Sequence, residues 1–185
     1  TAGEHLDVIT YSGNGEPTLH PDFPAIVDDT LALRSRYYPE AKVSVLTNST
    51  RIFDPAVAAA LKKVDNNILK LDSALDDTIR VLDRPNSPGF TADKVIESLR
   101  QFAGTGIIQT MMLRGEWEGR HIDNTTDAEV NALIEAYRRI APREIMLYSI
   151  DRPTPARTLE KIPAEELRAI GQRIHAATGI PVQVN

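Results

Sequence analysis

The sequence predicts an α/β fold in the form of a partial barrel of parallel strands. Short β-branched runs alternate with longer stripes of helical apolar periodicity. Connections from a helix to the next strand are short, whereas those from a strand to the next helix are long and polar. Strict alternation is typical of a parallel sheet, either doubly wound or part of a barrel. Because a full eight-stranded barrel takes about 250 residues, a partial barrel fits this chain better.

The strands are expected where short apolar runs are bounded by turn residues. In chain order they cover residues 6–12, 42–48, 67–72, 107–114, 144–150 and, near the end, 181–184. Helices are expected between them, with apolar stripes that begin at Phe23, Val57, Val95, Val130 and Leu167. Asp54 followed by Pro55 opens one helix, and Thr126 with Glu129 forms a capping box that opens another.

Composition favours one globular domain over residues 1–185, since 42% of the residues are hydrophobic and 25% are charged. A formal net charge of -5 argues against a protein whose main task is to grip a nucleic-acid backbone. No run of about 18 apolar residues and no signal peptide is visible, so we predict a cytoplasmic location without a membrane span. The sequence has no cysteine, and its four histidines lack metal-ligand spacing, so no metal site is predicted.

The string YSGNGEPTLHP, residues 11–21, follows the first strand and combines flexible backbone with one acid. Gly13, Asn14 and Gly15 can adopt positive φ with little penalty, so their backbone groups can turn toward a ligand. Glu16 adds a carboxylate there, and Pro17 fixes the direction of the chain. This combination suits an α-amino acid group. Neither a dinucleotide fingerprint nor a Walker A loop matches. A glycine-rich turn whose Glu16 faces water is the alternative.

Polar residues also follow the later strands, where the active sites of barrels and open α/β sheets are built. They are Asn48, Ser49 and Thr50; Lys70, Asp72 and Ser73; Thr110 and Arg114; and Arg152. Lys70 alternates with Leu69 and Leu71, so its side chain should point into the barrel. The alternative is an edge lysine whose amine snorkels to solvent. Asp72 and Ser73 fit equally well as caps of a following helix.

The ordered strings SGNGEPTLHPDF, LTNST, LKLD and YSIDRP resemble the radical S-adenosylmethionine (SAM) superfamily. They are most similar to its Fe–S oxidoreductases that act as pyruvate formate-lyase-activating and wyosine-forming enzymes. The family's Gly-Gly-Glu-Pro motif has its equivalent in residues 14–17, with Asn14 in the first glycine position. The resemblance covers about residues 6–152. It implies a partial (β/α)6 TIM-like barrel without its first βα unit, comprising strands 2 to 6 plus a C-terminal helix and strand.

The resemblance also implies how SAM would bind. The loop after the first strand of this chain, with Ser12, Gly13, Asn14, Gly15 and Glu16, would hold the methionine amino group. Residues at the next two strand ends would contact the carboxylate or the ribose; these are Asn48, Ser49, Lys70, Asp72 and Ser73. Arg114 would be a further carboxylate partner, because a guanidinium grips a carboxylate with two hydrogen bonds. No catalytic residue is assigned.

One family feature is missing from the sequence. Radical SAM enzymes hold a [4Fe–4S] cluster with Cys-x3-Cys-x2-Cys after their first strand, and this chain has no cysteine. We expect a core fragment that is inactive alone, its cluster segment having been lost upstream of Thr1. The intact enzyme would cleave SAM reductively to methionine and a 5′-deoxyadenosyl radical that abstracts hydrogen. Its substrate would be a small molecule, a protein glycyl residue or a modified RNA, with flavodoxin or ferredoxin as electron donor.

Two other functions stay open from the sequence. One is a cluster-free module that binds SAM or a nucleotide. The other is a partial-barrel lyase or aldolase in which Lys70 forms a Schiff base with a carbonyl substrate. Residues 115–125, which include Trp117, are expected as a long polar loop that either covers a substrate or is only solvated surface. Residues 84–89 are expected to link two helices.

Overall fold

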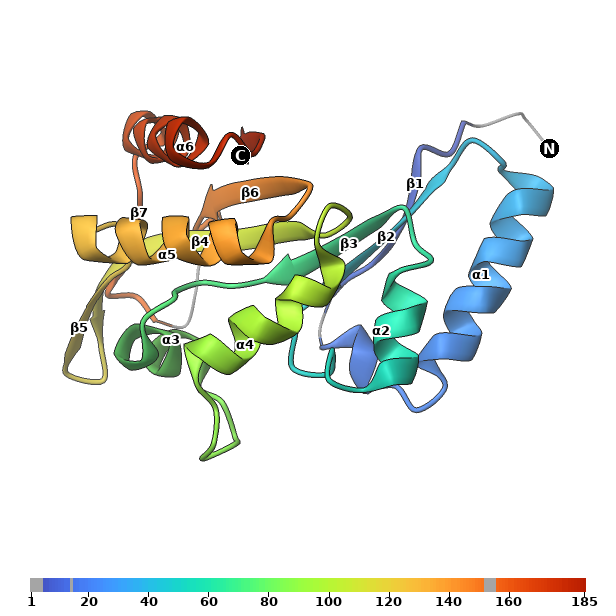
Figure 1. Ribbon diagram of the computed structural model, residues 1–185, viewed down its shortest axis with the longest axis horizontal. Helices are drawn as coiled ribbons and strands as arrows, with labels where there is room; N and C mark the ends of the chain where they lie inside the picture. Colours follow the sequence, from blue (N-terminus) through green and yellow to red (C-terminus); the bar gives the residue numbers. More distant parts are fainter. Residues whose placement is uncertain (1–4, 14, 152–155) are drawn as a thin grey trace. The chain divides into compact units, whose positions relative to one another are not determined.

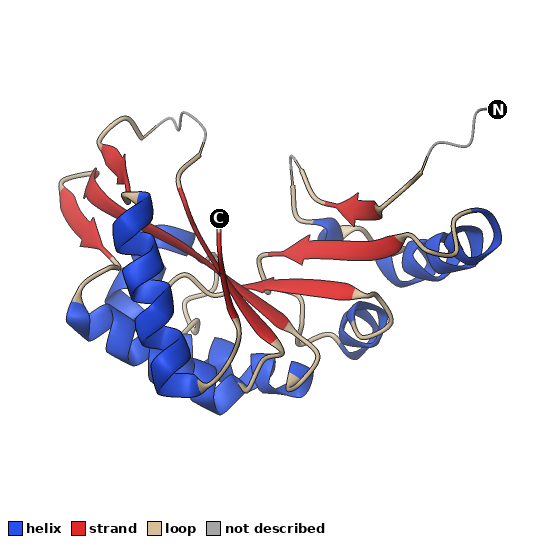
Figure 2. Cartoon of the chain, turned by 90° about the horizontal axis from the view of Figure 1, so that it is seen from above, coloured by secondary structure: helices blue, strands red, loops and turns tan. Residues whose placement is uncertain are grey.

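The computed structural model describes residues 5–13, 15–151 and 156–185. The chain divides into two compact units, Thr1–Lys70 and Leu71–Asn185, and each is described here by itself. In both units parallel strands alternate with helices along the chain (Figures 1 and 2). The predicted α/β fold class is therefore confirmed. The prediction of one domain over residues 1–185 stays a prediction.

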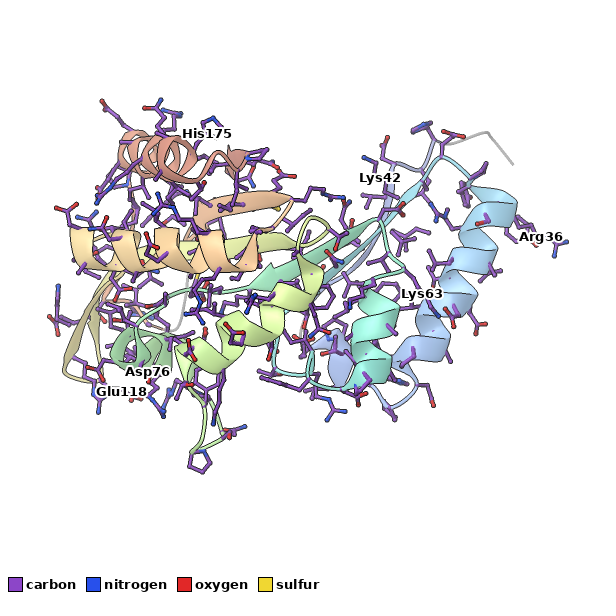
Figure 3. All side chains as sticks on the ribbon, in the orientation of Figure 1. Arg36, Lys42, Lys63, Asp76, Glu118 and His175 are labelled. Atoms are coloured by element: carbon purple, nitrogen blue, oxygen red, sulfur yellow. The ribbon has the colours of Figure 1, made fainter. Side chains whose placement is uncertain are left out.

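The first unit is built around a three-stranded parallel arrangement. It contains β1 (Val8–Tyr11), the short helix η1 (Pro17–Leu19), α1 (Phe23–Tyr37), β2 (Lys42–Thr47), α2 (Pro55–Leu61) and β3 (Asn66–Lys70). The central strand β2 pairs in parallel with β1 and with β3. Helices α1 and α2 lie side by side (Figure 1). Lys63, just beyond α2 and labelled in Figure 3, donates to Asp28 of α1 at 2.7 Å.

The two sides of β3 differ, as strand geometry requires. Asn67 donates to the backbone oxygen of Leu61 in α2 at 3.0 Å, and both Asn67 and Leu69 are buried. Lys70 alternates with Leu69, so its side chain leaves the strand on the side opposite α2 and is half-buried. This placement agrees with the alternation seen in the sequence.

The second unit contains five strands and four α-helices within the part of the chain that the structure describes. The strands are β4 (Ile107–Trp117), β5 (Arg120–Asp123), β6 (Glu144–Ser149), β7 (Leu159–Lys161) and β8 (Val182–Val184). The helices are α3 (Asp76–Asp83), α4 (Ala92–Leu99) with the short η2 (Arg100–Phe102), α5 (Asp127–Ile140) and α6 (Ala164–Thr178). Strand β6 pairs in parallel with β4 and β8, whereas β5 and β7 pair antiparallel with the C-terminal half of β4.

Local sequence signals explain where several helices begin and end. Asp54 caps α2 by accepting from the backbone N–H of Ala56 at 2.9 Å. Thr126 caps α5 by accepting from the N–H of Glu129 at 3.3 Å. Gly179 ends α6 in the left-handed region, with φ of 72°. None of the described helices has the length and apolar character of a membrane span.

The expectation of a long loop over residues 115–125 is wrong. Strand β4 continues to Trp117, Glu118 and Gly119 form the turn with φ of 50° and 74°, and β5 returns antiparallel from Arg120. Positive φ at both central residues is the geometry of a two-residue hairpin turn. The sequence hides this hairpin because most of its residues are polar, and its few apolar residues, such as Trp117 and Ile122, do not alternate along a strand. The same holds for the short strand β7.

Candidate functional site

Glu16, the acid of the glycine-rich segment, is the centre of a hydrogen-bonded cluster in the first unit. Its Oε1 accepts from the N–H of Thr18 at 3.1 Å, from the hydroxyl of Thr18 at 2.6 Å and from the hydroxyl of Thr47 at 2.6 Å. Its Oε2 accepts from the N–H of Asn48 at 2.6 Å. The carboxylate therefore ties the segment after β1 to the end of β2.

The four donors do not use the full capacity of this carboxylate. Two carboxylate oxygens offer about four lone-pair sites, two on each oxygen. Three donors crowd Oε1 of Glu16, whereas Oε2 receives only Asn48 among the described residues. All four donors are neutral protein groups, so the negative charge is hydrogen-bonded but not neutralised. One position on Oε2 is thus suited to a cationic donor.

The backbone beside Glu16 is open. Gly13 has φ of 139°, which favours glycine, and a Cβ built on Gly13 or Gly15 would meet no atom within 4 Å. Ser12 is also exposed. A cavity of about 600 Å³ lies here, lined by residues between Thr10 and Pro21, Glu16 among them. The predicted contact Asn14 lies outside the described residues.

Asn48 and Ser49 connect this cluster to β3. The Asn48 side chain accepts from the N–H of Thr50 at 3.0 Å, and its own N–H reaches Glu16. Ser49 is buried and has φ of 65°, an uncommon conformation for a residue other than glycine. Its hydroxyl donates to the backbone oxygen of Lys70 at 3.1 Å. Four predicted site residues, Glu16, Asn48, Ser49 and Lys70, are therefore linked by hydrogen bonds within one unit.

The predicted contacts of the second unit are placed differently. Asp72 and Ser73 are fully buried, at 0% exposure. Oδ1 of Asp72 accepts from the N–H of Met111 at 2.9 Å, and the Ser73 hydroxyl accepts from the N–H of Leu75 at 3.0 Å. Leu75 is the residue that precedes α3. Asp72 therefore bonds β4 and not the start of α3, and Ser73 bonds the N–H of the residue before α3, so neither forms a side-chain cap within that helix. Their contact with a ligand stays a prediction.

Glu129 and Tyr137 belong to the same buried region. The sequence analysis predicted no buried hydrogen bonds for either side chain. Glu129 of α5 is 4% exposed, and its carboxylate accepts from the hydroxyls of Ser73 at 2.7 Å and of Thr78. The Tyr137 hydroxyl lies 2.7 Å from that of Thr110, and burial raises the pKa of Tyr137, which keeps it neutral. The sequence did contain a sign of the role of Glu129, because this acid is the third residue of α5. We interpreted it only as half of a capping box.

Arg114 lies on β4, half-buried, and its guanidinium is paired with the carboxylate of Glu166 on α6. Asp123 of β5 and Glu160 of β7 stand opposite Arg114 in the two neighbouring strands. To bind a ligand carboxylate, as predicted, Arg114 would have to release the carboxylate of Glu166 and pair with the ligand in its place. Arg152, also named from the sequence, lies outside the described residues.

The fold and the site define an α/β protein with parallel strands, in which a glycine-rich segment and one incompletely neutralised carboxylate follow a parallel strand. No protein-family model matches the chain. A UPF0026 protein of Synechocystis is 29% identical over 96% of this chain and 71% of its own length. A UPF0026 protein of Helicobacter pylori is 24% identical over 88% of the chain and 49% of its own length.

The GTPase Obg of Brachyspira hyodysenteriae is 23% identical over 98% of this chain. The chain spans only 25% of that protein's length. The chain described here contains no Gly-Lys-Ser/Thr string, so it lacks the phosphate-binding loop of P-loop GTPases.

Solved structures share the fold at low sequence identity. A domain of pyruvate-formate lyase-activating enzyme from Bacteroides vulgatus has a TM-score of 0.66 and 16% identity, with 97% of this chain and 99% of that chain covered. SuiB of Streptococcus suis bound to S-adenosylmethionine has a TM-score of 0.65 and 13% identity, with 96% of this chain and 39% of that chain covered. TYW1 with a lysine-pyruvate adduct bound has a TM-score of 0.62 and 16% identity, with 92% and 50% covered. These structural neighbours are radical SAM enzymes, as the resemblance in the sequence predicts.

Proposed function

We propose that the chain is the core of a radical SAM enzyme and that its first unit binds the amino group of SAM through Glu16. The observation that carries this proposal is the remaining acceptor position on Oε2 of a carboxylate whose described donors are all neutral. An ammonium group placed there would make a charge-assisted hydrogen bond. A structural neighbour bound to S-adenosylmethionine supports the choice of ligand.

The residues around Glu16 fit an amino-acid group. The open backbone at Gly13 and Gly15 lets a ligand approach without meeting a Cβ, and the cavity of about 600 Å³ has the size of small-ligand pockets. Asn48 and Thr47 hold the carboxylate in place, so the amino group would meet a preorganised acceptor. In this proposal SAM, once bound, supplies the chemistry of a sulfonium that can be cleaved by one-electron reduction.

A [4Fe–4S] cluster does not fit the residues of this chain. Such clusters are held by cysteine thiolates, and the sequence has no cysteine. The described residues also contain no group of three or more His, Asp or Glu side chains that could hold a metal ion. We therefore assign the chain the binding and orientation of SAM and no step that passes through a cluster.

The test is calorimetric titration of SAM into the chain and into Glu16→Gln. The variant keeps the size of the side chain but loses its charge, so we expect SAM to bind about tenfold or more weakly. Glu40→Gln removes an exposed acid of the same unit and should leave the affinity unchanged. Equal affinity of wild type and Glu16→Gln would contradict the proposal.

A loosened segment in Glu16→Gln would also weaken binding, so a second variant separates the two causes. Thr47→Val removes one of the donors that hold the carboxylate but keeps the charge. It should bind SAM within about threefold of wild type. If Thr47→Val loses as much affinity as Glu16→Gln, Glu16 acts through the shape of the segment and the direct contact is refuted.

A second candidate function uses Lys70 as a Schiff-base amine. It is favoured by a neighbour with a lysine-pyruvate adduct bound, TYW1, and by the half-buried position of Lys70 at the end of β3. Incubation with pyruvate and borohydride should then add mass to Lys70, found by peptide mass spectrometry. Lys42, exposed on β2 of the same unit, is the control. An unmodified Lys70 would remove this candidate.

A further inference from the structure

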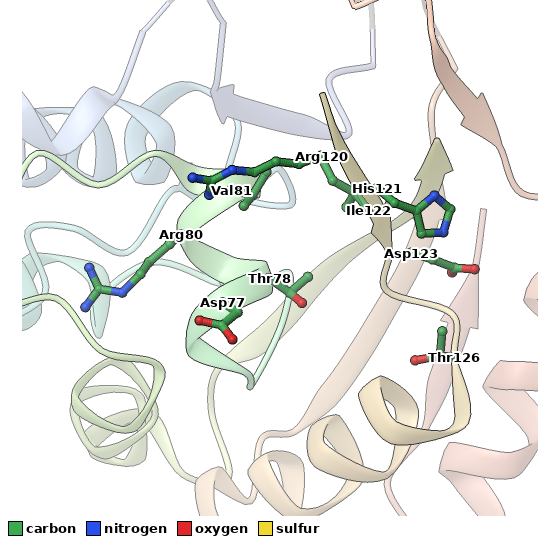
Figure 4. A pocket seen from close by; sticks show the side chains of 9 residues that line it. All are labelled: Asp77, Thr78, Arg80, Val81, Arg120, His121, Ile122, Asp123 and Thr126. Carbon is green, nitrogen blue, oxygen red and sulfur yellow. The ribbon is translucent and has the colours of Figure 1, made fainter. Parts of the chain in front are cut away.

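The second unit has a cleft between α3 and the β4–β5 hairpin that none of the functions above uses. Its volume is about 580 Å³, within the range of small-ligand pockets. Figure 4 shows that its lining comes from α3 on one side and from β5 on the other, with Thr126 before α5 at one end. The cleft therefore lies beside β5, which has one edge paired with β4 and a second edge facing away from it.

That edge of β5 is open. Asn124 donates to the Leu113 oxygen at 3.3 Å, and Glu116 of β4 donates to the Thr158 oxygen at 3.3 Å, so successive residues of β4 bond alternately toward β5 and β7. By the same alternation the N–H and C=O groups of His121 and Asp123 point away from β4. No residue in the described part of the chain forms a ladder on that side. An open edge of this kind is a template for a further strand.

The side chains give the cleft two different ends. The side chain of Arg120 extends from β5 toward α3, whereas that of Arg80 extends from α3 away from β5, and Asp77 is the acid that α3 contributes to the lining (Figure 4). Asp123 lies at the end of the cleft away from Arg120 (Figure 4). Arg120 forms no ion pair with any described residue, whereas Arg80 donates to the Phe90 oxygen and keeps further N–H groups. Val81 and the buried Ile122 give apolar surface between the ends.

The hairpin that carries this edge has a regular turn, and its strand β4 is paired on both sides. Its turn has the positive φ angles of a two-residue hairpin, and Glu118 in the turn pairs with Arg84 just after α3 at 3.4 Å. Strand β4 is flanked by β5 on one side and β7 on the other, which fixes its direction. The cleft is thus bounded by structured backbone on both sides.

We propose that this cleft binds an extended polypeptide segment that pairs with the open edge of β5. Main-chain hydrogen bonds to His121 and Asp123 would supply affinity, as in other cases of strand addition. An acidic side chain of the segment would meet Arg120. A basic side chain would meet Oδ2 of Asp123, because Oδ1 already accepts from the N–H and the hydroxyl of Thr125. This proposal does not depend on SAM binding, because every residue that carries it belongs to the second unit.

The experiment is a titration of isotope-labelled chain, without SAM, with two capped peptides, Ac-Glu-Val-Thr-Val-Lys-NH2 and its reverse, Ac-Lys-Val-Thr-Val-Glu-NH2. The reversed order covers parallel and antiparallel pairing. We expect saturable shifts of the backbone amide signals of His121 and Asp123 with at least one peptide. The same peptide with its three central amides N-methylated should bind about tenfold or more weakly, since it loses the edge hydrogen bonds.

Two arginine variants test the charged end. Arg120→Gln should weaken binding about threefold, which is typical of an exposed ion pair, whereas Arg168→Gln on α6 should leave it unchanged. The proposal is overturned if neither peptide moves the amides of His121 and Asp123. It is equally overturned if the N-methylated peptide binds as tightly, or if both arginine variants weaken binding alike.

Discussion

At the scale of single residues, Glu16 has a structural role, and our proposal gives the same acid a binding role. Its donors Thr18, Thr47 and Asn48 come from two segments that are distant in sequence, so the carboxylate holds the glycine-rich segment against the end of β2. The same bonds fix the direction in which its remaining acceptor position can be used. A ligand would therefore find the acid already oriented.

Removing one of these donors should cost stability. Thr47 is 5% exposed, and its hydroxyl both donates to Glu16 and accepts from the N–H of Ser49 at 3.1 Å. We expect Thr47→Val to lower the free energy of unfolding by about 1–3 kcal/mol, measured by urea denaturation. Thr50→Val removes an exposed hydroxyl bonded to Asn48 and should change it by less than about 0.5 kcal/mol. Similar values for both variants would contradict the assigned role of Thr47.

At the scale of elements, the pairing of β7 with β4 depends on Gly115. This residue has φ of 136°, and a Cβ there would collide with the backbone of Thr158 and Leu159 beside β7. We expect Gly115→Ala to lower the free energy of unfolding by about 2–4 kcal/mol. Gly119→Ala in the turn has φ of 74° but open space around it, and should cost only about 1 kcal/mol. Equal losses in the two variants would show that close packing of β7 is unimportant.

Helices α4 and α5 are joined by ion pairs at their surface. Arg139 of α5 donates to Asp93 and to Glu97 of α4, each at 2.7 Å. Hydrogen bonds from Arg139, and next from Arg100, hold the pKa of Glu97 below its usual value of 4.5. A carboxylate with a lowered pKa stabilises the fold above its unfolded pKa and loses this contribution as pH falls through the folded one.

This linkage predicts a pH-dependent difference between wild type and Glu97→Gln. At pH 7 the wild type should be the more stable, and the difference should shrink as pH is lowered below 4.5. Thermal unfolding midpoints measured at several pH values check it. If the difference between the unfolding midpoints stays constant from pH 7 to well below pH 4.5, the charge of Glu97 contributes nothing to stability.

The elements themselves were largely predictable from the sequence. Apolar runs and caps such as Asp54 and Thr126 located the parallel strands and most helices within a few residues. The hairpin was missed because polar strands carry no apolar periodicity. Its one local sign was Glu118-Gly119, since glycine in a turn between short segments is a hairpin signal.

At the scale of the whole molecule, sequence reasoning predicted the fold class better than it predicted contacts. Three solved structures with TM-scores of 0.62 to 0.66 share the fold, although their identity to the chain is only 13% to 16%. The burial of Asp72 and Ser73, and the pairing of Arg114 with Glu166, depend on partners far along the chain. A strand-end position predicts that a residue is near a site, but it does not predict whether protein groups already occupy its hydrogen bonds.

The central claim is that Glu16 receives the amino group of SAM, and a comparison of two ligands tests it most directly. Calorimetry would measure the affinity of SAM and of an analogue that lacks only the amino group, for wild type and for Glu16→Gln. We expect wild type to bind the analogue about tenfold or more weakly than SAM, and Glu16→Gln to bind both alike. Equal affinity of wild type for the two ligands would contradict the account.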